Sequence, residues 1–257
     1  MEINNKVKDD FEKYKQYVTH RSYIFSIEEL NEIQEIYEEL YLFSEIIVNY
    51  QILDRKSMIR EFINECKNAL IISYDLLNMN YLNASKQVFR GSIESFFRFS
   101  LAFSRYETYK SNCSKGNYGV TEELKNLKTL YTCQKVYKLT SGTIEYFKDI
   151  PVVTCFSELN NIYSELSSSV HVNSTDDFSP QKYLIEYTKI NIEETRKVCQ
   201  KVKRILNNYL LILVYFESKM NFNGISKRNM QLFETFLNSA DSLILEKIEN
   251  YSNIVIS

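Results

Sequence analysis

The sequence predicts an all-α protein built as a bundle of long helices, and three observations lead to this expectation. Only two prolines and five glycines occur in 257 residues, so few positions can break a helix or form a tight turn. Apolar residues recur at intervals of three and four over long stretches. Strand-like alternation over more than four residues is absent, apart from the final segment 253–257.

Helical periodicity marks the elements of the first half of the chain. Ser26 and Glu29 have the spacing of a capping box, and a helix is expected behind them over 27–52. Its repeating apolar positions are Ile33, Ile36, Tyr37, Leu40, Tyr41, Ile47 and Val48. A second helix is expected over 55–79. The next stretch, 81–110, is apolar around most of its circumference, which is typical of a helix at the centre of a bundle.

Turn and cap signals divide the second half. A loop is expected over 111–120, and Thr121 is a candidate N-cap for a helix that runs to about 139. Gly142 and Pro151 are expected to break the chain into a short irregular helix. The remaining expected elements are a helix over 153–170, a loop that closes on Pro180, a long helix over 181–220, and a last helix over 226–251 that begins after Gly224.

Composition limits the class of protein. The net charge of −2 gives no overall basic excess that would attract nucleic acid or anionic lipid. Five widely spaced cysteines suit neither zinc ligation nor a redox pair, so we expect reduced thiols in a cytoplasmic protein. The N-terminal residues have no secretory h-region, and the longest apolar run, 209–216, is too short to span a membrane. We therefore expect a cytoplasmic chain that does not enter the membrane.

A polar stripe runs along the expected central helix. At 100° per residue its members fall within an arc of about 80°, and they are Asn83, Gln87, Arg90, Glu94, Arg98 and Arg105. Arg90 and Arg98 could hold an anionic group with Glu94 as an orienting residue or base, because guanidinium forks match phosphate geometry. The same residues could equally form ordinary ion pairs on the one solvated face of the helix. A single sequence does not separate these interpretations.

His171 is the second candidate for chemistry, because histidine titrates near neutral pH. It ends the helix expected over 153–170, where the helix dipole favours the imidazolium and raises the pKa of the imidazole. A histidine that only caps this helix is the alternative. Neither His171 nor His20 has metal-ligand spacing, so no metal site is expected.

A basic cluster lies in the expected helix over 181–220. Lys197, Lys201 and Arg204 share one face and could contact RNA or an acidic protein partner. Neighbouring Glu193 and Glu194 suggest instead a solvated face whose charges are balanced locally. Glycine-rich phosphate loops, nucleophile elbows and zinc-protease motifs are absent, so no cofactor is expected and the question of catalysis stays open.

Two segments, ALIISYDLLNMNYLNASKQVFRGSIESFFRF and LNNIYSELSSSVH, together resemble prokaryotic HEPN-like helical proteins of toxin–antitoxin and anti-phage defence systems. The first resembles the central helix pair of that class, with Arg90 and Glu94 in the position of its Arg-x-x-x-Glu, and the second resembles its histidine-bearing helix, with His171 as the histidine. The ribonuclease members separate an arginine from the histidine by four to six residues, where this chain has Ser164, Glu165 and Leu166.

The lack of repeats, low-complexity tracts and linkers predicts one all-helical domain over 1–257 with a C-terminal helical hairpin at 181–251. The resemblance covers about residues 60 to 175 and implies a HEPN-like core at 55–175. It implies an interaction or sensing module of a defence or stress system, expected as a homodimer, with RNA or a protein from the same operon as a further partner. The alternative is a metal-independent endoribonuclease that uses His171 with Arg90 and Arg98.

Overall fold

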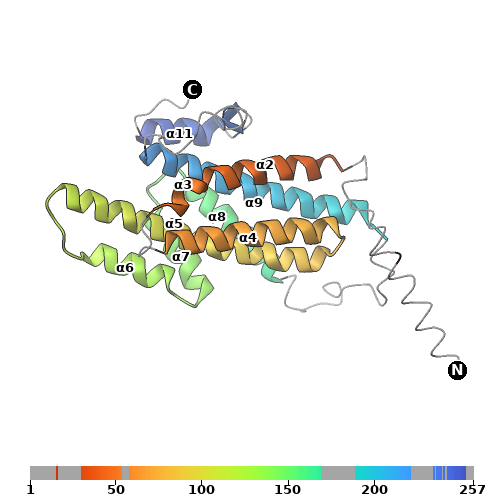
Figure 1. The fold of residues 1–257 in the computed structure, drawn as a ribbon, viewed down its shortest axis with the longest axis horizontal. Helices are drawn as coiled ribbons and strands as arrows, with labels where there is room; N and C mark the ends of the chain where they lie inside the picture. The colour runs from red at the N-terminus through yellow and green to blue at the C-terminus, as the bar shows by residue number, and fades with distance from the viewer. Residues whose placement is uncertain are drawn as a thin grey trace.

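The structure, a computed structural model, describes residues 30–53, 58–168, 189–220 and 242–252, together with positions 16, 234, 236–238 and 240. All regular secondary structure in these ranges is helical, which confirms the all-α prediction (Figure 1). The helices are α2 (Glu32–Ile46), α3 (Val48–Gln51), α4 (Ile59–Asn78), α5 (Leu82–Ser114), α6 (Glu122–Tyr131), α7 (Val136–Tyr146), α8 (Val153–Ser168), α9 (Ile192–Lys219) and α11 (Ser242–Ser252).

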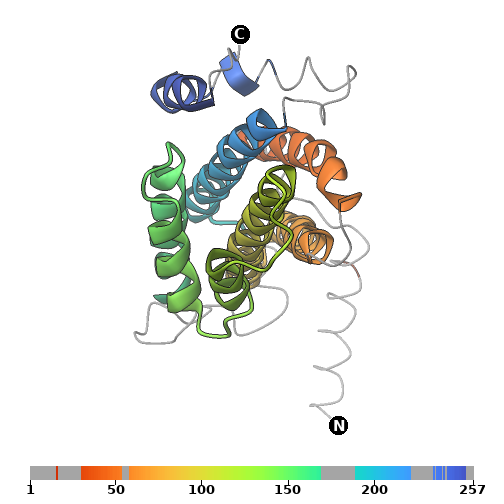
Figure 2. The same cartoon turned by 90° about the vertical axis from the view of Figure 1, so that its left-hand side faces the viewer.

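The longest helix, α5, lies at the centre of the bundle. In the view of Figure 2 it lies between α4, α9 and the helices α6 to α8. Its large buried side chains point in several directions, as the sequence predicts for a helix that is apolar nearly all round. They are Phe89, Ile93, Phe96, Phe97, Phe99, Leu101 and Phe103. The helix also runs four residues further than expected, to Ser114.

Small residues allow α4 and α5 to pack closely as a hairpin. The buried Ser85 hydroxyl of α5 donates to the carbonyl of Ser73 on α4 (2.8 Å), and the Ser73 hydroxyl donates to the Ala69 carbonyl (2.6 Å). The turn between the helices contains Asn80 in a left-handed conformation (φ 63°), which asparagine tolerates better than most residues. Its side chain donates to the carbonyl of Lys189 (3.1 Å) and so ties this turn to the segment before α9.

The helix expected after Thr121 is divided in the structure. The helix expected over 121–139 is two helices, α6 and α7, with Thr121 as the N-cap of α6, as predicted. Gly142 does not break a helix, because it lies inside α7. A Cβ atom at Gly142 would lie 2.5 Å from the Leu130 side chain of α6, so the glycine permits close approach of the two helices.

Other boundaries also differ from the prediction. The first expected helix begins at Glu32 rather than 27 and is interrupted at Ile47. Of the helix expected from 181, positions 181–188 lie outside the described residues, 189–191 are not helical, and α9 begins at Ile192, where the Asn191 side chain accepts a hydrogen bond from the Glu194 amide and caps the helix. Ala240 lies in a bend, so the last expected helix is not continuous. Ser26, Pro180 and Gly224 lie outside the described residues.

Aromatic rings join the helices into one hydrophobic cluster. The ring of Tyr209 on α9 stacks on Phe96 of α5 with centroids 4.0 Å apart, and its hydroxyl contacts the hydroxyl of Ser92 (3.1 Å). Phe43 of α2 packs against both rings, at 5.8 Å from Tyr209 and 6.4 Å from Phe96. The helices α2, α5 and α9 therefore share one aromatic centre.

All five cysteines are free thiols, and Cys66, Cys155 and Cys199 are buried on α4, α8 and α9. Within the described ranges, no helix has the length and apolar character needed to cross a membrane.

Candidate functional site

The polar stripe of α5 meets α8 at Tyr163. The Arg90 Nε donates to the Tyr163 hydroxyl (3.2 Å), and that hydroxyl donates to Glu94 Oε1 (2.9 Å). Arg90 and Glu94 also form an ion pair at 3.7 Å, with side chains 26% and 25% exposed, and the guanidinium lies 5.2 Å from the centre of the Tyr163 ring. Burial and the bond to Glu94 raise the pKa of Tyr163. The two charges are thus coupled through a neutral phenol.

Tyr163 was not among the candidate residues. It is part of the histidine-bearing segment, but only the fold brings it to Arg90 and Glu94, which lie about 70 positions earlier in the chain. The phenol accepts one N–H of the arginine and donates to one oxygen of the glutamate, so a single hydroxyl links the two charged groups.

The other two arginines of the stripe contact α6 and not α8. Arg98 donates to the backbone carbonyl of Tyr131, the last residue of α6, at 2.6 Å, and Arg105 donates to the carbonyl of Leu124 at 3.1 Å. A cation at a helix C-terminus is favoured by the helix dipole. The structure therefore does not bring Arg98 together with Arg90 and Glu94, and the contacts of Arg98 suit a helix-capping role.

His171 lies outside the described residues, and so does His20. The helix expected to end next to His171 is described as far as Ser168.

The basic cluster of α9 is paired with glutamates. Lys201 and Arg204 bind Glu165 and Glu158 of α8, at 2.8 and 2.9 Å. Lys197 binds Glu193 of its own helix at 2.7 Å. These contacts match the second interpretation of the cluster, in which the charges are balanced locally, and they leave little uncompensated positive potential for an RNA backbone.

On its other side α9 is linked to α2. Arg196 binds Glu32 at 3.2 Å, and Lys203 binds Glu35. Ion pairs thus connect α9 to α8 along one edge and to α2 along the other, around the aromatic centre.

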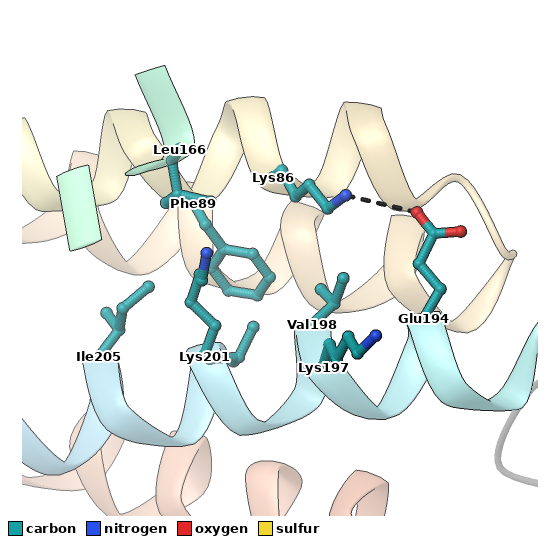
Figure 3. Close-up of a pocket in the computed structure, with 9 residues that line it drawn as sticks. Lys86, Phe89, Leu166, Glu194, Lys197, Val198, Lys201 and Ile205 are labelled. Atoms are coloured by element: carbon teal, nitrogen blue, oxygen red, sulfur yellow. Dashed lines mark ion pairs between the residues drawn. The ribbon is translucent and has the colours of Figure 1, made fainter. Parts of the chain in front are cut away.

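A pocket of about 160 Å³ lies where α5, α8 and α9 meet, next to the basic cluster (Figure 3). Lys86, Glu194, Lys197 and Lys201 provide its polar lining, and its apolar lining consists of Phe89, Leu166, Val198, Val202 and Ile205. Lys197 and Lys201 are predicted binding residues, whereas nothing in the sequence around Lys86 marks it as one. No set of three or more His, Cys, Asp or Glu side chains in the described ranges is arranged to hold a metal ion.

A second polar group is buried near the C-terminal end of α9. Glu217 is fully buried, and its carboxylate faces the buried Tyr50 hydroxyl without a hydrogen bond of normal geometry to any of the described residues. Burial raises the pKa of Glu217 to about 7, and the facing carboxylate contributes to the raised pKa of the buried Tyr50. Glu39 of α2 is also affected by burial, which raises its pKa to about 7.

Comparison of the chain with protein-family models, with curated proteins and with solved structures gives no match. The HEPN resemblance therefore rests on the two quoted segments alone.

The Arg90–Tyr163–Glu94 contacts predict non-additive effects on stability. Because Arg90 and Glu94 share the Tyr163 hydroxyl, each single alanine substitution removes the ion pair and leaves the remaining charge with the phenol alone. A double-mutant cycle over Arg90→Ala and Glu94→Ala, measured by urea denaturation, should give a coupling free energy of roughly 0.5 to 1.5 kcal/mol. Repeating the cycle in Tyr163→Phe should reduce that coupling, and strictly additive effects in both backgrounds would contradict this geometry.

The raised pKa of Glu217 predicts that the free energy of unfolding falls as the pH rises. Its pKa is raised from 4.5 to about 7 in the folded chain, so the folded state binds the extra proton between these values. The stability gained by protonation is present below about pH 4.5 and is lost as the pH rises through about 7. Glu217→Gln should therefore stabilise the protein above pH 7, by on the order of 3 kcal/mol.

The measurement is the free energy of unfolding from pH 4.5 to 8. Glu122→Gln is the matched control, because the Glu122 side chain is 75% exposed. Glu39→Gln should act with the same sign as Glu217→Gln, since burial raises the pKa of both carboxyls. A Glu217→Gln profile parallel to that of the wild type would contradict the prediction.

Proposed function

We propose that this chain is a cytoplasmic helical interaction module of a prokaryotic defence or stress system, and that α2 and α3 form its binding face. The defence or stress setting rests on the HEPN resemblance. The binding face rests on one observation, a stripe of exposed apolar side chains.

The stripe consists of Tyr37, Tyr41, Val48 and Ile52. Tyr37 and Tyr41 lie about one turn apart on α2, Val48 is the first residue of α3, and Ile52 directly follows α3. Their exposed fractions are 56%, 43%, 49% and 82%. Aligned exposed apolar side chains of this kind are typical of a protein–protein contact surface.

The apolar surface continues from α2 onto α4. The Tyr37 ring contacts the ring of Tyr74 on α4, with centroids 6.0 Å apart. Ile71 precedes Tyr74 by one helical turn and is also exposed. A partner helix placed along α2 could therefore contact two helices of this chain at once.

The surroundings of the stripe are acidic. α2 and α3 contain five glutamates and no lysine or arginine. Glu32 and Glu35 are paired with cations of α9, whereas Glu38 is exposed next to Tyr37 and accepts a hydrogen bond from the neutral side chain of Gln34 (2.9 Å). An acidic border repels an RNA backbone and favours a basic partner.

We take the partner to be a protein with an amphipathic helix whose apolar side chains are bordered by lysine or arginine. Such a helix would pair its apolar face with the stripe and its basic border with the glutamates. A second copy of this chain that used the same face would place one acidic border against another, which costs free energy. Charge complementarity thus favours a different protein over the homodimer expected from the sequence.

Two designed peptides test this proposal. Both carry leucines at the a and d positions of an amphipathic helix, and the bordering positions are lysine in one peptide and glutamate in the other. The lysine peptide should bind at least about ten-fold more tightly at low salt, and its affinity should fall as salt is added. Fluorescence anisotropy of labelled peptide gives both affinities.

Tyr41→Glu combined with Val48→Glu should abolish peptide binding. Tyr137→Glu is the matched control, because Tyr137 is exposed (65%) but lies on α7. Equal affinity for the two peptides, or binding that survives the double substitution, would refute this binding face. A dimer in sedimentation velocity that the double substitution dissociates would identify the second copy as the occupant instead.

The endoribonuclease is the second proposal, and one contact supports it. Arg90 and Glu94 bind Tyr163, which lies on the helix that precedes His171 in the chain. In this proposal His171 transfers a proton while Arg90 neutralises the scissile phosphate. Because Arg98 is hydrogen-bonded to the carbonyl of Tyr131 on α6, we do not expect it to contribute to this site.

RNA cleavage in the presence of EDTA distinguishes the two proposals. Under the endoribonuclease proposal, the full chain should cleave a labelled RNA without metal ions, and His171→Ala should lose at least about a hundred-fold in rate. His20→Ala is the control. Under the interaction-module proposal, wild type and both variants should show the same background rate.

A further inference from the structure

The pocket between α5, α8 and α9 has the composition of a small-molecule site. Its apolar lining comes from all three helices, and each of these five side chains is at most 5% exposed. Pockets that bind small ligands are typically apolar with a few polar groups at their edge. A cavity of about 150 Å³ lined by such side chains is large enough to hold a benzene ring, and this pocket has a volume of about 160 Å³.

Lysines make up most of the polar edge of the pocket. Three lysines and one glutamate line it. Lys197 and Lys201 are paired with Glu193 (2.7 Å) and Glu165 (2.8 Å), but an ammonium has three N–H donors, so each keeps donors for a further acceptor. The side chains of Lys86 and Lys201 are only 20% and 30% exposed, so an anion bound between them would be partly shielded from water and its attraction to lysine would be stronger than on an open surface.

Lys86 is the lysine most readily turned toward a ligand. Its ion pair with Glu194 is long (3.5 Å), and so is its hydrogen bond to Asn83 (3.4 Å). Figure 3 shows the Lys86–Glu194 pair joining α5 to α9 at the pocket, with Lys201 reaching toward Phe89 from α9. A ligand carboxylate could replace Glu194 as the partner of Lys86 without breaking a short contact.

We propose that this pocket binds an organic monocarboxylate with an apolar body of one aromatic ring or a short alkyl chain. The apolar body would lie against Phe89 and Val202, and the carboxylate would lie between Lys86 and Lys201. Because the site joins three helices, an occupied pocket would hold α5, α8 and α9 together. This inference is independent of the proposed binding face on α2 and α3.

Binding is tested on the full chain with four probes. Benzoate and hexanoate carry both features of the ligand, acetate lacks the apolar body, and benzyl alcohol lacks the charge. Isothermal titration calorimetry should detect benzoate or hexanoate at millimolar concentration or below, with acetate and benzyl alcohol at least about ten-fold weaker. Equal affinity for benzyl alcohol and benzoate, or no binding by either carboxylate, would overturn the proposal.

Substitutions with opposite expected effects on benzoate affinity locate the site. Lys86→Gln and Lys201→Gln should each weaken benzoate binding about ten-fold. Glu194→Gln should tighten it several-fold, because Lys86 then has no competing carboxylate in the pocket. Lys128→Gln on the exposed face of α6 is the matched control. Circular dichroism confirms that each variant is folded.

Unchanged affinity in Lys86→Gln and Lys201→Gln would overturn the assignment to this pocket. A weaker affinity in Glu194→Gln would also overturn it, because that result would make the glutamate a ligand-binding group and not a competitor for Lys86.

Discussion

The rest of the bundle depends on the requirement to bury α5 on all sides. Its phenylalanines point toward several neighbours, so a single packing partner would leave part of the helix in water. α4 covers one face through small residues, α9 contributes Tyr209 and Phe216, and α6 to α8 cover the remainder. The other helices are thus arranged around one apolar rod.

The central position of α5 also limits which hydrogen-bond partners its polar side chains can reach. Polar groups on a buried helix need partners, because an unpaired polar group away from water is costly. Arg98 and Arg105 find carbonyls of α6, whereas Arg90 and Glu94 find Tyr163. The charged residues of the polar stripe, which the sequence offered as a candidate anion site, therefore form contacts that orient α6 and α8 on α5. The pocket lies further toward the start of α5, where Lys86 has only long contacts.

The fold class and the central helix could be predicted because both depend on local patterns, the scarcity of breakers and the spacing of apolar residues. Other features depend on tertiary contacts. Gly142 looked like a helix breaker, but its absent side chain makes room for Leu130 on another helix. Tyr37 and Tyr41 belong to the apolar pattern of α2, yet they lie outside the core, since periodicity alone does not show how wide the buried face is. Tyr163 and Lys86 carry no local signal of their roles.

Opening of the helix bundle can be followed through its three buried thiols. Cys66, Cys155 and Cys199 lie on α4, α8 and α9, and each reacts with an alkylating reagent only after its helix moves away from its neighbours. Burial also raises the pKa of the Cys66 and Cys199 thiols, so little reactive thiolate is present in the closed state. The chain therefore carries natural kinetic probes in three separate helices, and their relative alkylation rates distinguish local opening of one helix from cooperative unfolding of the whole bundle.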